Sequence, residues 1–316
     1  MGYTLAIIIV NWNTAELLRQ CLLSIWANTD VADRRVYVVD NASVDHSVAM
    51  VREHFPDVVL LENDLNLGFA AGNNLALTRL LAEKELPKYI LFLNTDIVLA
   101  STTLATTLAA FTADERLGAT GPALVYPTGV YQVGGAGYAL SVTSFFLYTS
   151  LLFKVLPLRL ARSFFVDQAR YQDCRQAVEV DWLAGACLMV RTRVIQEVGG
   201  WNTDYFLYAE DAEYCDRIKT AGWRLVYLPY VRVIHHHGAS SGQDTRVNTR
   251  WIVPFLRYAR EKYPDGRHHL IRLLLVSGTF LRFLLYCAAW AVSRQARFRN
   301  KSNELYAYFR TALFLK

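Results

Sequence analysis

The stretch that decides the fold is residues 5–41, LAIIIVNWNTAELLRQCLLSIWANTDVADRRVYVVDN. Residues 5–10 form an unbroken apolar run rich in isoleucine, which is typical of a strand buried on both faces. Residues 15–28 place apolar side chains at helical spacing, and residues 36–40 form a second apolar strand. A strand, a helix and another strand at this spacing predict a βαβ unit, whose two strands run parallel.

The same alternation continues toward the C-terminus. The patterns predict helices at residues 44–54, 70–83, 101–113, 192–198 and 209–221, and strands at residues 58–61, 89–93, 224–228 and 231–235. We therefore expect an α/β fold with a mostly parallel sheet flanked by helices. Because no internal repeat or low-complexity linker is visible, we expect one domain over residues 1–250 and a helical appendage over residues 251–316.

Composition places the chain among folded proteins. Of its 316 residues, 53% are hydrophobic and 19% are charged, which excludes disorder and fibrous repeats as its main state. The five cysteines are scattered and never spaced as Cys-x-x-Cys, which argues against a disulfide framework or a thiolate zinc site and suits a reducing cytosol. The N-terminal apolar run is too short for a secretory signal, so we expect a cytoplasmic protein.

Charge is distributed unevenly along the chain. Residues 1–250 carry 21 Lys and Arg against 25 Asp and Glu, whereas residues 251–316 carry 12 against 3. The basic residues of the tail lie among Leu, Phe and Trp, and not in a pattern that would track a groove, which argues against nucleic acid as a partner. A basic and apolar tail instead favours an anionic membrane surface.

Two apolar segments support this interpretation. In the apolar segment at residues 270–292, the uncharged runs 273–281 and 283–293 are separated by Arg282 alone, and a central arginine costs roughly 2.5–3.5 kcal/mol in a spanning helix. We therefore predict a helix that lies in the lipid headgroup region. The alternative is a helix packed on the first domain, or on a second copy of the chain in a homo-oligomer. Residues 138–153 form another uncharged run, rich in aromatic residues.

Polar residues follow four of the predicted strands. Asn11 and Asn13 follow the first strand, Asp40 and Asn41 end the second, residues 62–66 follow the third, and residues 94–96 end the fourth. In an open α/β sheet the carboxyl ends of the strands meet at one edge, where ligands bind. Four polar strand ends in register therefore indicate a binding site at that edge.

The turn after the first strand narrows the kind of site. Residues 11–16, NWNTAE, contain no glycine, so the turn matches neither the dinucleotide-binding fingerprint nor a phosphate-binding P-loop. A Rossmann dehydrogenase and a P-loop kinase are both disfavoured. The glycine-rich stretch NLGFAAGNN, residues 66–74, follows the third strand instead, where it would let a helix N-terminus approach a diphosphate.

Five segments in order carry a resemblance to a known family. They are VYVVDNASVD (36–45), ENDLNLGFAAGNN (62–74), LNTD (93–96), WLAGA (182–186) and GGWNTDYFLYAED (199–211). Together they resemble the family 2 glycosyltransferases, and most closely the rhamnosyltransferase-like branch of bacterial surface polysaccharide synthesis. The resemblance runs from about residue 5 to residue 240, and five ordered motifs are far more specific than any one of them.

The resemblance implies a GT-A fold, a nucleotide-sugar donor, a divalent cation and inversion at the anomeric carbon. It implies a nucleotide-binding half at about residues 1–115 and an acceptor-binding half at about residues 116–250. Asp40 resembles the residue that recognises the pyrimidine base, with Asn41 and Asp45 supporting it. A carboxylate that accepts the N3 hydrogen of uracil or thymine would select pyrimidines, because a base without that hydrogen would leave the carboxylate without a hydrogen bond.

The donor site predicted from these motifs comprises Asn11, Asn13, Asp40, Asn41, Asp45, Asn66, Gly68, Gly72, Asn73, Asn94 and Asp96. Asn94-Thr95-Asp96 occupies the place of the family's Asp-x-Asp metal motif, so the first acid is replaced by an amide. His235, 24 residues after Asp211, resembles a third metal ligand. We expect Mg²⁺ or Mn²⁺ to be held by Asp96 and His235, with the imidazole compensating in part for the missing carboxylate.

Asp211 matches the family's catalytic base, and Glu210 lies beside it. Because a helix should begin near residue 209, the positive end of its dipole favours ionised Asp211. Trp182, Gly185, Trp201 and Tyr208 resemble acceptor-site residues, since aromatic rings stack on sugar C–H faces. For Trp182, packing in the core is an equally good interpretation.

These observations lead to one hypothesis. The chain is expected to transfer a hexosyl group, L-rhamnose above all, from a dTDP or UDP donor to a glycan or polyprenyl-linked saccharide at the inner face of the cell membrane, to which it binds peripherally. One alternative is a transferase for another UDP- or dTDP-sugar. A second is a non-catalytic homologue that acts as a membrane-bound binding or assembly protein, which the amide at Asn94 would favour.

Overall fold

The computed structural model describes residues 2–236 and 248–315. The chain forms two compact units: Met1–Gly137 with Val166–Gln243, and Tyr138–Phe165 with Asp244–Lys316. This division differs from the expected boundary at residue 250, because a segment from within the predicted acceptor-binding half joins the C-terminal helices. Part of the motif region, residues 237–240, lies outside the described residues.

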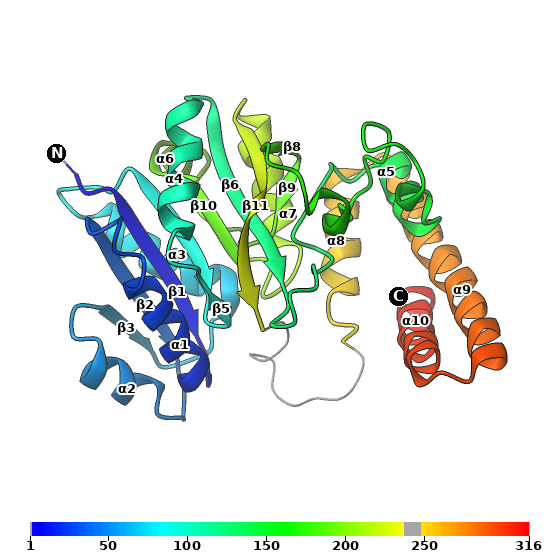
Figure 1. Ribbon diagram of the computed structural model, residues 1–316, viewed down its shortest axis with the longest axis horizontal. Helices are drawn as coiled ribbons and strands as arrows, with labels where there is room; N and C mark the ends of the chain where they lie inside the picture. The colour runs from blue at the N-terminus through cyan, green and yellow to red at the C-terminus, as the bar shows by residue number, and fades with distance from the viewer. Residues whose placement is uncertain (1, 237–247, 316) are drawn as a thin grey trace. The chain divides into compact units, whose positions relative to one another are not determined.

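The first unit is built on a nine-stranded mixed sheet (Figure 1). Its parallel half contains β1 (Leu5–Asn11), β2 (Arg34–Asn41), β3 (Val59–Asn63) and β4 (Tyr89–Asn94) in the order β3-β2-β1-β4. The order continues β10-β6-β11-β5 through β10 (Cys187–Arg191), β6 (Leu117–Val125), β11 (Arg224–His235) and β5 (Ile97–Val98), and β8 (Val178–Val180) pairs with β11. The expected α/β fold with a mostly parallel sheet is confirmed.

The apolar run that opens the chain is buried because helices cover both faces of β1. Leu5, Ile7 and Ile9 belong to the core shared with α1 (Ala15–Trp26), α2 (Ser47–His54) and α4 (Thr103–Ala113). On the opposite face, Val10 packs against Gly72 of α3 (Gly68–Leu81) so closely that a Cβ there would lie 2.8 Å from a Val10 methyl group. Continuous hydrophobicity, and not alternation, is what a strand in this position requires.

The sequence-predicted strands at residues 224–228 and 231–235 are one strand in the structure. In β11, Leu228 pairs with Pro122 of β6 and Arg232 pairs with the next residue, Ala123, so three residues bulge out of the ladder. Pro229 lies in this bulge and has no N–H to donate, so the interruption predicted there is local and does not end the strand. The helix predicted at residues 44–54 begins three residues later, at Ser47.

The remaining elements of the first unit link the sheet to its helices. They are the two-stranded sheet of β7 (Ala136–Gly137) and β9 (Trp182–Leu183), the 3₁₀ helix η2 (Gln168–Tyr171), α6 (Thr192–Val198) and α7 (Glu210–Thr220). The α7 helix packs against β9 and β11. The N-terminus of α7 therefore lies next to the segment between β9 and β10.

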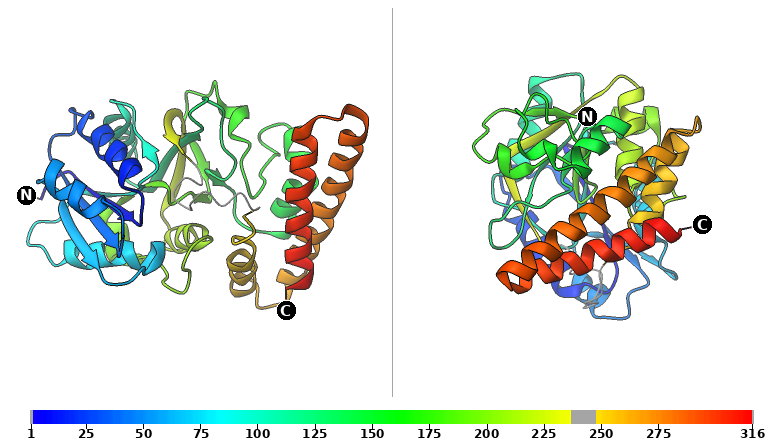
Figure 2. Two further views of the ribbon diagram at one scale, coloured as in Figure 1. Left: turned by 90° about the horizontal axis from the view of Figure 1, so that it is seen from below. Right: turned by 90° about the vertical axis from the view of Figure 1, so that its right-hand side faces the viewer.

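The second unit is helical. It contains α5 (Val142–Thr149), η1 (Leu152–Lys154), α8 (Ile252–Lys262), α9 (Arg267–Ser293) and α10 (Ala296–Phe314). The long helices α9 and α10 run side by side as a hairpin (Figure 2). Three aromatic rings contact one another with centroid distances of 5.1–6.1 Å: Phe145 of α5, Phe255 of α8, and Phe164 from the segment before η2. This unit therefore has an aromatic core of its own.

Candidate functional site

The register of the parallel strands brings the polar strand ends together. Asn11, at the end of β1, pairs with Asp40 of β2, and Val10 pairs with Asn94 of β4. Asn41 pairs with Asn63 at the end of β3. All four strands therefore deliver polar residues to one edge of the sheet, as their order along the chain predicts.

Asp40 is buried and held by two hydrogen bonds. The Asn11 amide donates to Asp40 Oδ1 at 2.7 Å, and the backbone N–H of Ser43 donates to Oδ2 at 2.8 Å. Asn11 also donates to the Ser43 hydroxyl at 3.1 Å and accepts from the Thr14 hydroxyl at 2.7 Å. The carboxylate therefore has a fixed orientation, which a group that recognises one hydrogen of a ligand requires.

Asn13 and Asp45 tie the loops after β1 and β2 to each other. Asn13 Oδ1 accepts the backbone N–H of Val44 at 2.8 Å, and Asp45 Oδ2 accepts that of Ala15 at 2.9 Å. Partial burial acts to raise the pKa of Asp45, but hydrogen bonds from Ser47 and Ala15 outweigh it and leave the pKa below its usual value. These side chains shape the edge by crosslinking its loops.

The predicted residues around α3 also bond mainly to the protein itself. The Asn41 amide donates to the Gly68 carbonyl at 3.1 Å and to Asn66 Oδ1 at 3.3 Å. Gly68 has φ +79°, and a Cβ there would lie within 2.8 Å of Phe206, so only glycine fits. Asn73 donates to the Phe69 carbonyl in its own helix, and Gly72 gives close helix–strand packing.

Asp96 and His235 lie next to each other where β5 begins and β11 ends. His235 Nε2 lies 3.4 Å from Asp96 Oδ1, and within the described part of the chain that buried oxygen has no hydrogen-bond partner. The backbone N–H of His236 donates to the Asp96 carbonyl at 2.9 Å and fixes the two strands at this point. No group of three or more His, Cys, Asp or Glu residues arranged to hold a metal occurs within residues 2–236 and 248–315.

Asp211 is the second residue of α7 and lies against the segment that leads into β10. The backbone N–H of Gly185 donates to Asp211 Oδ2 at 3.3 Å, and that of Ala212 donates to Oδ1 at 2.8 Å. The neighbouring Ala186 carbonyl accepts the backbone N–H of Asn94 at 2.9 Å. Residues 185–186 thus join Asp211 to the Asn94–Asp96 segment, and Asp40, Asp96 and Asp211 share one edge of the sheet.

The backbone before α7 is strained where it places this carboxylate. Tyr208 and Ala209, neither of them glycine, have φ values of +71° and +69°. Each left-handed residue of this kind costs of order 1 kcal/mol or more, and such residues cluster at functional sites. The two left-handed residues turn the chain sharply just before α7, and Glu210 and Asp211 both lie in the first turn of that helix.

Glu210 and Asp211 form a coupled carboxyl pair. Burial raises the pKa of Asp211, while its hydrogen bonds from Gly185 and Ala212 act in the opposite direction. Burial and the charge of Asp211 raise the pKa of Glu210 to about 8, and among the residues described its Oε2 accepts no hydrogen bond. Asp211 accepts from the backbone N–H groups of two other residues, Gly185 and Ala212, whereas Glu210 has only its own backbone N–H. Glu210 is therefore the partner that keeps a proton at neutral pH.

The predicted acceptor-site aromatics are mostly buried. Trp201 packs among Phe92, Tyr214 and Phe69 with centroid distances of 4.7–5.1 Å, and its backbone N–H donates to Asn74. Trp182 is also buried, as the packing interpretation expects, and Tyr208 is half-buried. Gly185 leaves room for this cluster, because a Cβ there would lie 3.2 Å from both Phe69 and Trp201.

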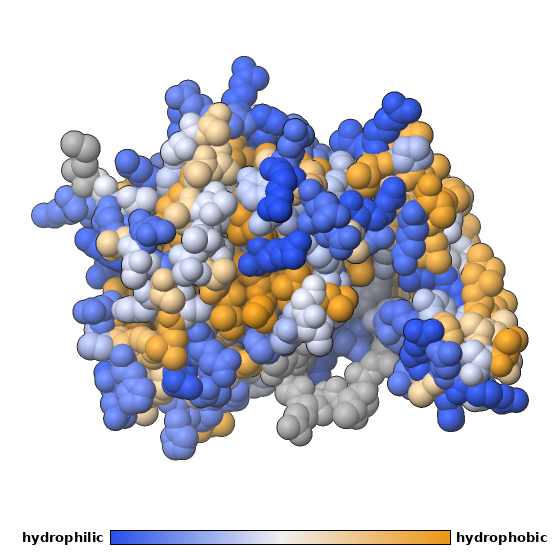
Figure 3. Space-filling model, viewed as in Figure 1, coloured by the Kyte–Doolittle hydropathy of each residue, from blue (hydrophilic) through white to orange (hydrophobic). Residues whose placement is uncertain are grey.

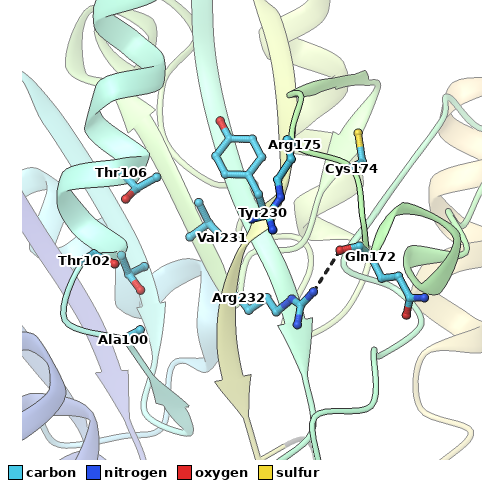
Figure 4. A pocket seen from close by; sticks show the side chains of 10 residues that line it. Ala100, Thr102, Thr106, Gln172, Cys174, Arg175, Tyr230, Val231 and Arg232 are labelled. Atoms are coloured by element: carbon cyan, nitrogen blue, oxygen red, sulfur yellow. Dashed lines mark hydrogen bonds between the residues drawn. The ribbon is translucent and has the colours of Figure 1, made fainter.

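A separate cavity of 380 Å³ lies between the start of α4, β11 and residues 172–175 (Figure 4). Arg175, Tyr230 and Arg232 line it, and Arg232 donates to the Gln172 carbonyl at 3.0 Å. Its described lining includes none of the predicted site residues. This cavity is therefore separate from the predicted site at the carboxyl edge of the sheet.

Comparison with known proteins identifies the family. Residues 3–253 match the family model described as "Glycosyltransferase like family 2". The chain belongs to this family. The expected GT-A fold and glycosyltransferase activity are thereby supported on the same residues that carry the motifs.

Two rhamnosyltransferases are similar to this chain over most of its length. The chain is 28% identical over 251 residues to an N-acetylglucosaminyl-diphospho-decaprenol L-rhamnosyltransferase of Mycobacterium tuberculosis, covering 77% of this chain and 80% of the relative. It is 27% identical over 282 residues to Rhamnosyltransferase WbbL of Escherichia coli K12, covering 83% and 95%.

Two solved glycosyltransferase structures share the fold. The mannosyltransferase PcManGT from Pyrobaculum calidifontis, in complex with GDP-Man and Mn²⁺, has a TM-score of 0.60 at 18% identity, covering 99% of this chain and 86% of that one. GalNAc-T7 with UDP, GalNAc and Mn²⁺ has a TM-score of 0.54 at 15% identity, covering 74% and 43%.

Sequence reasoning missed two residues that bond to the predicted site residues. Ser43 bonds to Asn11, Asn13 and Asp40, and its place inside the 36–45 motif was a signal for it. Gln132 is buried and bonded to His235, but it lies in a glycine-rich stretch that indicates only turns. A contact across 103 residues leaves no periodic pattern in the sequence.

The raised pKa of Glu210 predicts a pH dependence of stability. Folded Glu210 binds its proton up to about pH 8, whereas the unfolded residue releases it near pH 4.5. Across that window the native state holds more protons, so the free energy of unfolding should fall as pH rises. Glu210→Gln should remove this loss and unfold at higher urea concentration than the wild type at pH 8.

Urea denaturation at pH 5 and pH 8 measures the effect. Glu53→Gln, which alters an exposed carboxyl on α2, is the control and should follow the wild type at both values. Equal pH dependence in Glu210→Gln and the wild type would contradict the raised pKa.

Proposed function

We propose that this glycosyltransferase moves L-rhamnose from a dTDP-linked donor to a lipid-linked saccharide, with inversion at the anomeric carbon, in bacterial surface polysaccharide synthesis. The printed activities of the M. tuberculosis and E. coli relatives support the choice of sugar. The observation that carries the proposal is that residues 185–186 contact both Asp211 and Asn94. The proposed base would then lie near residues 94–96, which are proposed to meet the cation and the donor's diphosphate. A UDP-sugar is the alternative donor.

Asp40 is proposed to select the pyrimidine. Asn11 and Ser43 occupy one direction of each carboxylate oxygen, which leaves acceptor capacity for the N3 hydrogen of thymine or uracil. A purine presents a different edge to this carboxylate. The site would therefore discriminate by leaving a buried group unpaired with the wrong base.

The residues at Asp96 fit a divalent cation. Asp96 Oδ1 is a buried anionic oxygen without a hydrogen bond from any described residue, and the imidazole of His235 lies 3.4 Å away. Oxygen and imidazole ligands suit Mn²⁺, and Mg²⁺ would rely more on Asp96, water and phosphate oxygens. When bound, such a cation would offset the charge on the departing diphosphate. Asn94 would contribute at most its amide oxygen.

Asp211 is proposed as the general base, with Glu210 as a residue that keeps the pair singly charged. The proton held by Glu210 leaves Asp211 as the carboxylate, and the backbone N–H groups of Gly185 and Ala212 orient it. Asp211 would accept the proton of the acceptor hydroxyl as its oxygen attacks the anomeric carbon opposite the diphosphate. With base, donor residues and cation ligands at one edge, a non-catalytic assembly role is not retained.

The helical unit is proposed to bind the membrane peripherally. The helix α9 has a mean hydropathy of 1.7 over its most apolar window and is long enough to span a membrane by length and composition. Arg282, however, lies over the Tyr148 ring at 5.5 Å, so it faces α5. Exposed along α9 are Leu270, Leu273, Phe280, Leu281, Leu284, Leu285 and Val292, and Figure 3 shows apolar surface along this helix.

Basic residues border that apolar surface. Arg294, Arg297, Arg299 and Lys301 follow α9 directly, where they would meet anionic headgroups. An apolar helix face with a basic border is typical of a helix lying in the membrane interface. This placement suits an acceptor carried on a polyprenyl lipid.

Asp211→Asn tests the base assignment. The amide keeps the shape but cannot take a proton, so kcat for transfer from dTDP-rhamnose should fall about 10²- to 10⁴-fold. The dissociation constant for dTDP, measured by calorimetry, should change less than about threefold. Asp204→Asn, an exposed carboxyl seven residues earlier, should retain activity. Normal turnover by Asp211→Asn would end the assignment.

Asp40→Asn tests the donor class. Replacing one acceptor oxygen by an amide should weaken dTDP binding about tenfold or more, because a buried hydrogen bond is lost. Thermal shifts with UDP, dTDP and GDP, each with Mn²⁺, measure selectivity through stabilisation by the bound ligand. A larger shift with GDP than with either pyrimidine nucleotide would contradict the role of Asp40.

Leu284→Glu with Leu285→Glu tests membrane binding. Charge on the exposed face of α9 should reduce co-sedimentation with vesicles of anionic phospholipid at least tenfold. The control is Val44→Glu, an exposed position in the first unit, which should sediment like the wild type. Wild-type protein that resists extraction by alkaline carbonate would instead indicate a spanning helix.

A further inference from the structure

Gln132 holds the ring and the backbone of His235 at the same time. Its Nε2 donates to the His235 carbonyl at 2.6 Å, and its Oε1 lies 2.7 Å from His235 Nδ1. Both residues are buried, with exposed fractions of 3% and 7%. A two-point contact of this kind fixes the side-chain torsions of the imidazole as well as its position.

The contact also decides which ring nitrogen carries the hydrogen. A backbone carbonyl can only accept a hydrogen bond, so the Gln132 atom beside it must be the amide nitrogen. The amide oxygen then faces Nδ1, and because that oxygen can only accept, Nδ1 must be protonated. In neutral His235 the lone pair is therefore on Nε2.

The nitrogen that carries this lone pair lies close to another electron-pair donor. Nε2 lies 3.4 Å from Asp96 Oδ1, a buried oxygen for which the described residues provide no hydrogen bond. Two acceptors facing each other in a buried site are unfavourable unless a cation or a proton lies near both. Between a carboxylate oxygen and an imidazole nitrogen, a divalent cation satisfies both.

Gln132 is itself held in place by a second buried glutamine. Its backbone N–H donates to the Leu124 carbonyl at 2.9 Å, and its own carbonyl accepts from Gln168 Nε2 at 2.7 Å. Gln168 Oε1 in turn accepts from the Leu124 N–H and the Tyr227 hydroxyl. A Cβ at Gly135 would lie 2.3 Å from Gln168 Nε2, so glycine leaves room for this network.

We infer that Gln132 is a positioning residue that sets the tautomer and ring orientation of His235, so that Nε2 is ready to bind a divalent cation together with Asp96. The inference rests on the proposed function, which makes these two residues the cation ligands. It adds a residue that neither touches the cation nor lies in a motif of the family resemblance. Because its partners are in place without the cation, the ligand geometry is preorganised.

Gln132→Met tests the inference with Mn²⁺ as the probe. Methionine fills a similar volume but cannot bond to Nδ1, so the dissociation constant for Mn²⁺, measured by electron paramagnetic resonance of the free ion in the presence of dTDP, should rise about 10- to 100-fold. Gln132→Glu keeps an oxygen for Nδ1 but loses the donor to the His235 carbonyl, so it should recover part of the affinity. Unchanged affinity in Gln132→Met, or a loss of affinity that Gln132→Glu does not recover at all, would overturn the inference.

Gln168→Met separates positioning from folding. It breaks the same buried network one residue further from His235, so it should lower the melting temperature as Gln132→Met does but change the Mn²⁺ dissociation constant less than about threefold. Equal loss of Mn²⁺ affinity in the two variants would mean that Gln132 acts only through stability. Long-range ¹H–¹⁵N spectra of the metal-free protein should show the Nδ1–H tautomer for His235, and this preference should disappear in Gln132→Met.

His235→Ala distinguishes failure of the inference from failure of the proposed function. Unchanged Mn²⁺ affinity in His235→Ala would remove His235 from the cation site and with it the function proposed for this pair. Weaker binding in His235→Ala with normal binding in Gln132→Met would overturn only the role of Gln132. Weaker binding in both, with recovery by Gln132→Glu, supports both.

Discussion

The antiparallel pairing of β10 with β4 is the contact on which the site depends. Cys187 pairs with Leu93, and just beyond them the Asn94 N–H donates to the Ala186 carbonyl. This pairing inserts a strand from the second half of the unit beside the last parallel strand of the first half. The pairing also connects Asp211 to these strand ends, because Asp211 accepts the backbone N–H of Gly185, one residue before Ala186.

The polar groups at the edge differ in how they are satisfied. Asn11 bonds to Asp40, and Asn41 and Asp45 bond to the backbone of neighbouring segments, so they form a rigid frame. Asp96 Oδ1 and Glu210 Oε2 instead lack hydrogen bonds from the described residues, and Tyr208 and Ala209 are strained. Buried unpaired oxygens and left-handed backbone are unfavourable for folding and concentrate at functional sites. In this protein they coincide with the residues proposed to meet the cation and the acceptor.

The helical unit differs from the α/β unit in that one of its helices exposes a row of apolar side chains. Its aromatic core around Phe145, Phe164 and Phe255 is internal, yet α9 keeps a row of large apolar side chains exposed. Arg282, which argued from the sequence against a spanning helix, turns toward Tyr148 and leaves the exposed face apolar. A soluble unit rarely leaves such a face uncovered, which is why a membrane surface is its proposed partner.

The sequence by itself determined the parallel half of the sheet, the polar strand ends and the family. These features are local: continuous apolar runs such as residues 5–10, and motifs whose spacing survives without any long-range contact. The tertiary structure alone decided the position of β10, the single bulged β11, the burial of Trp201, the joining of residues 138–165 to the C-terminal helices and the Gln132–His235 contact. Each of these features depends on residues that are tens of positions or more away in the chain. Hydrophobic periodicity cannot specify such partners, because it shows which face of a segment is buried but not which other segment covers that face.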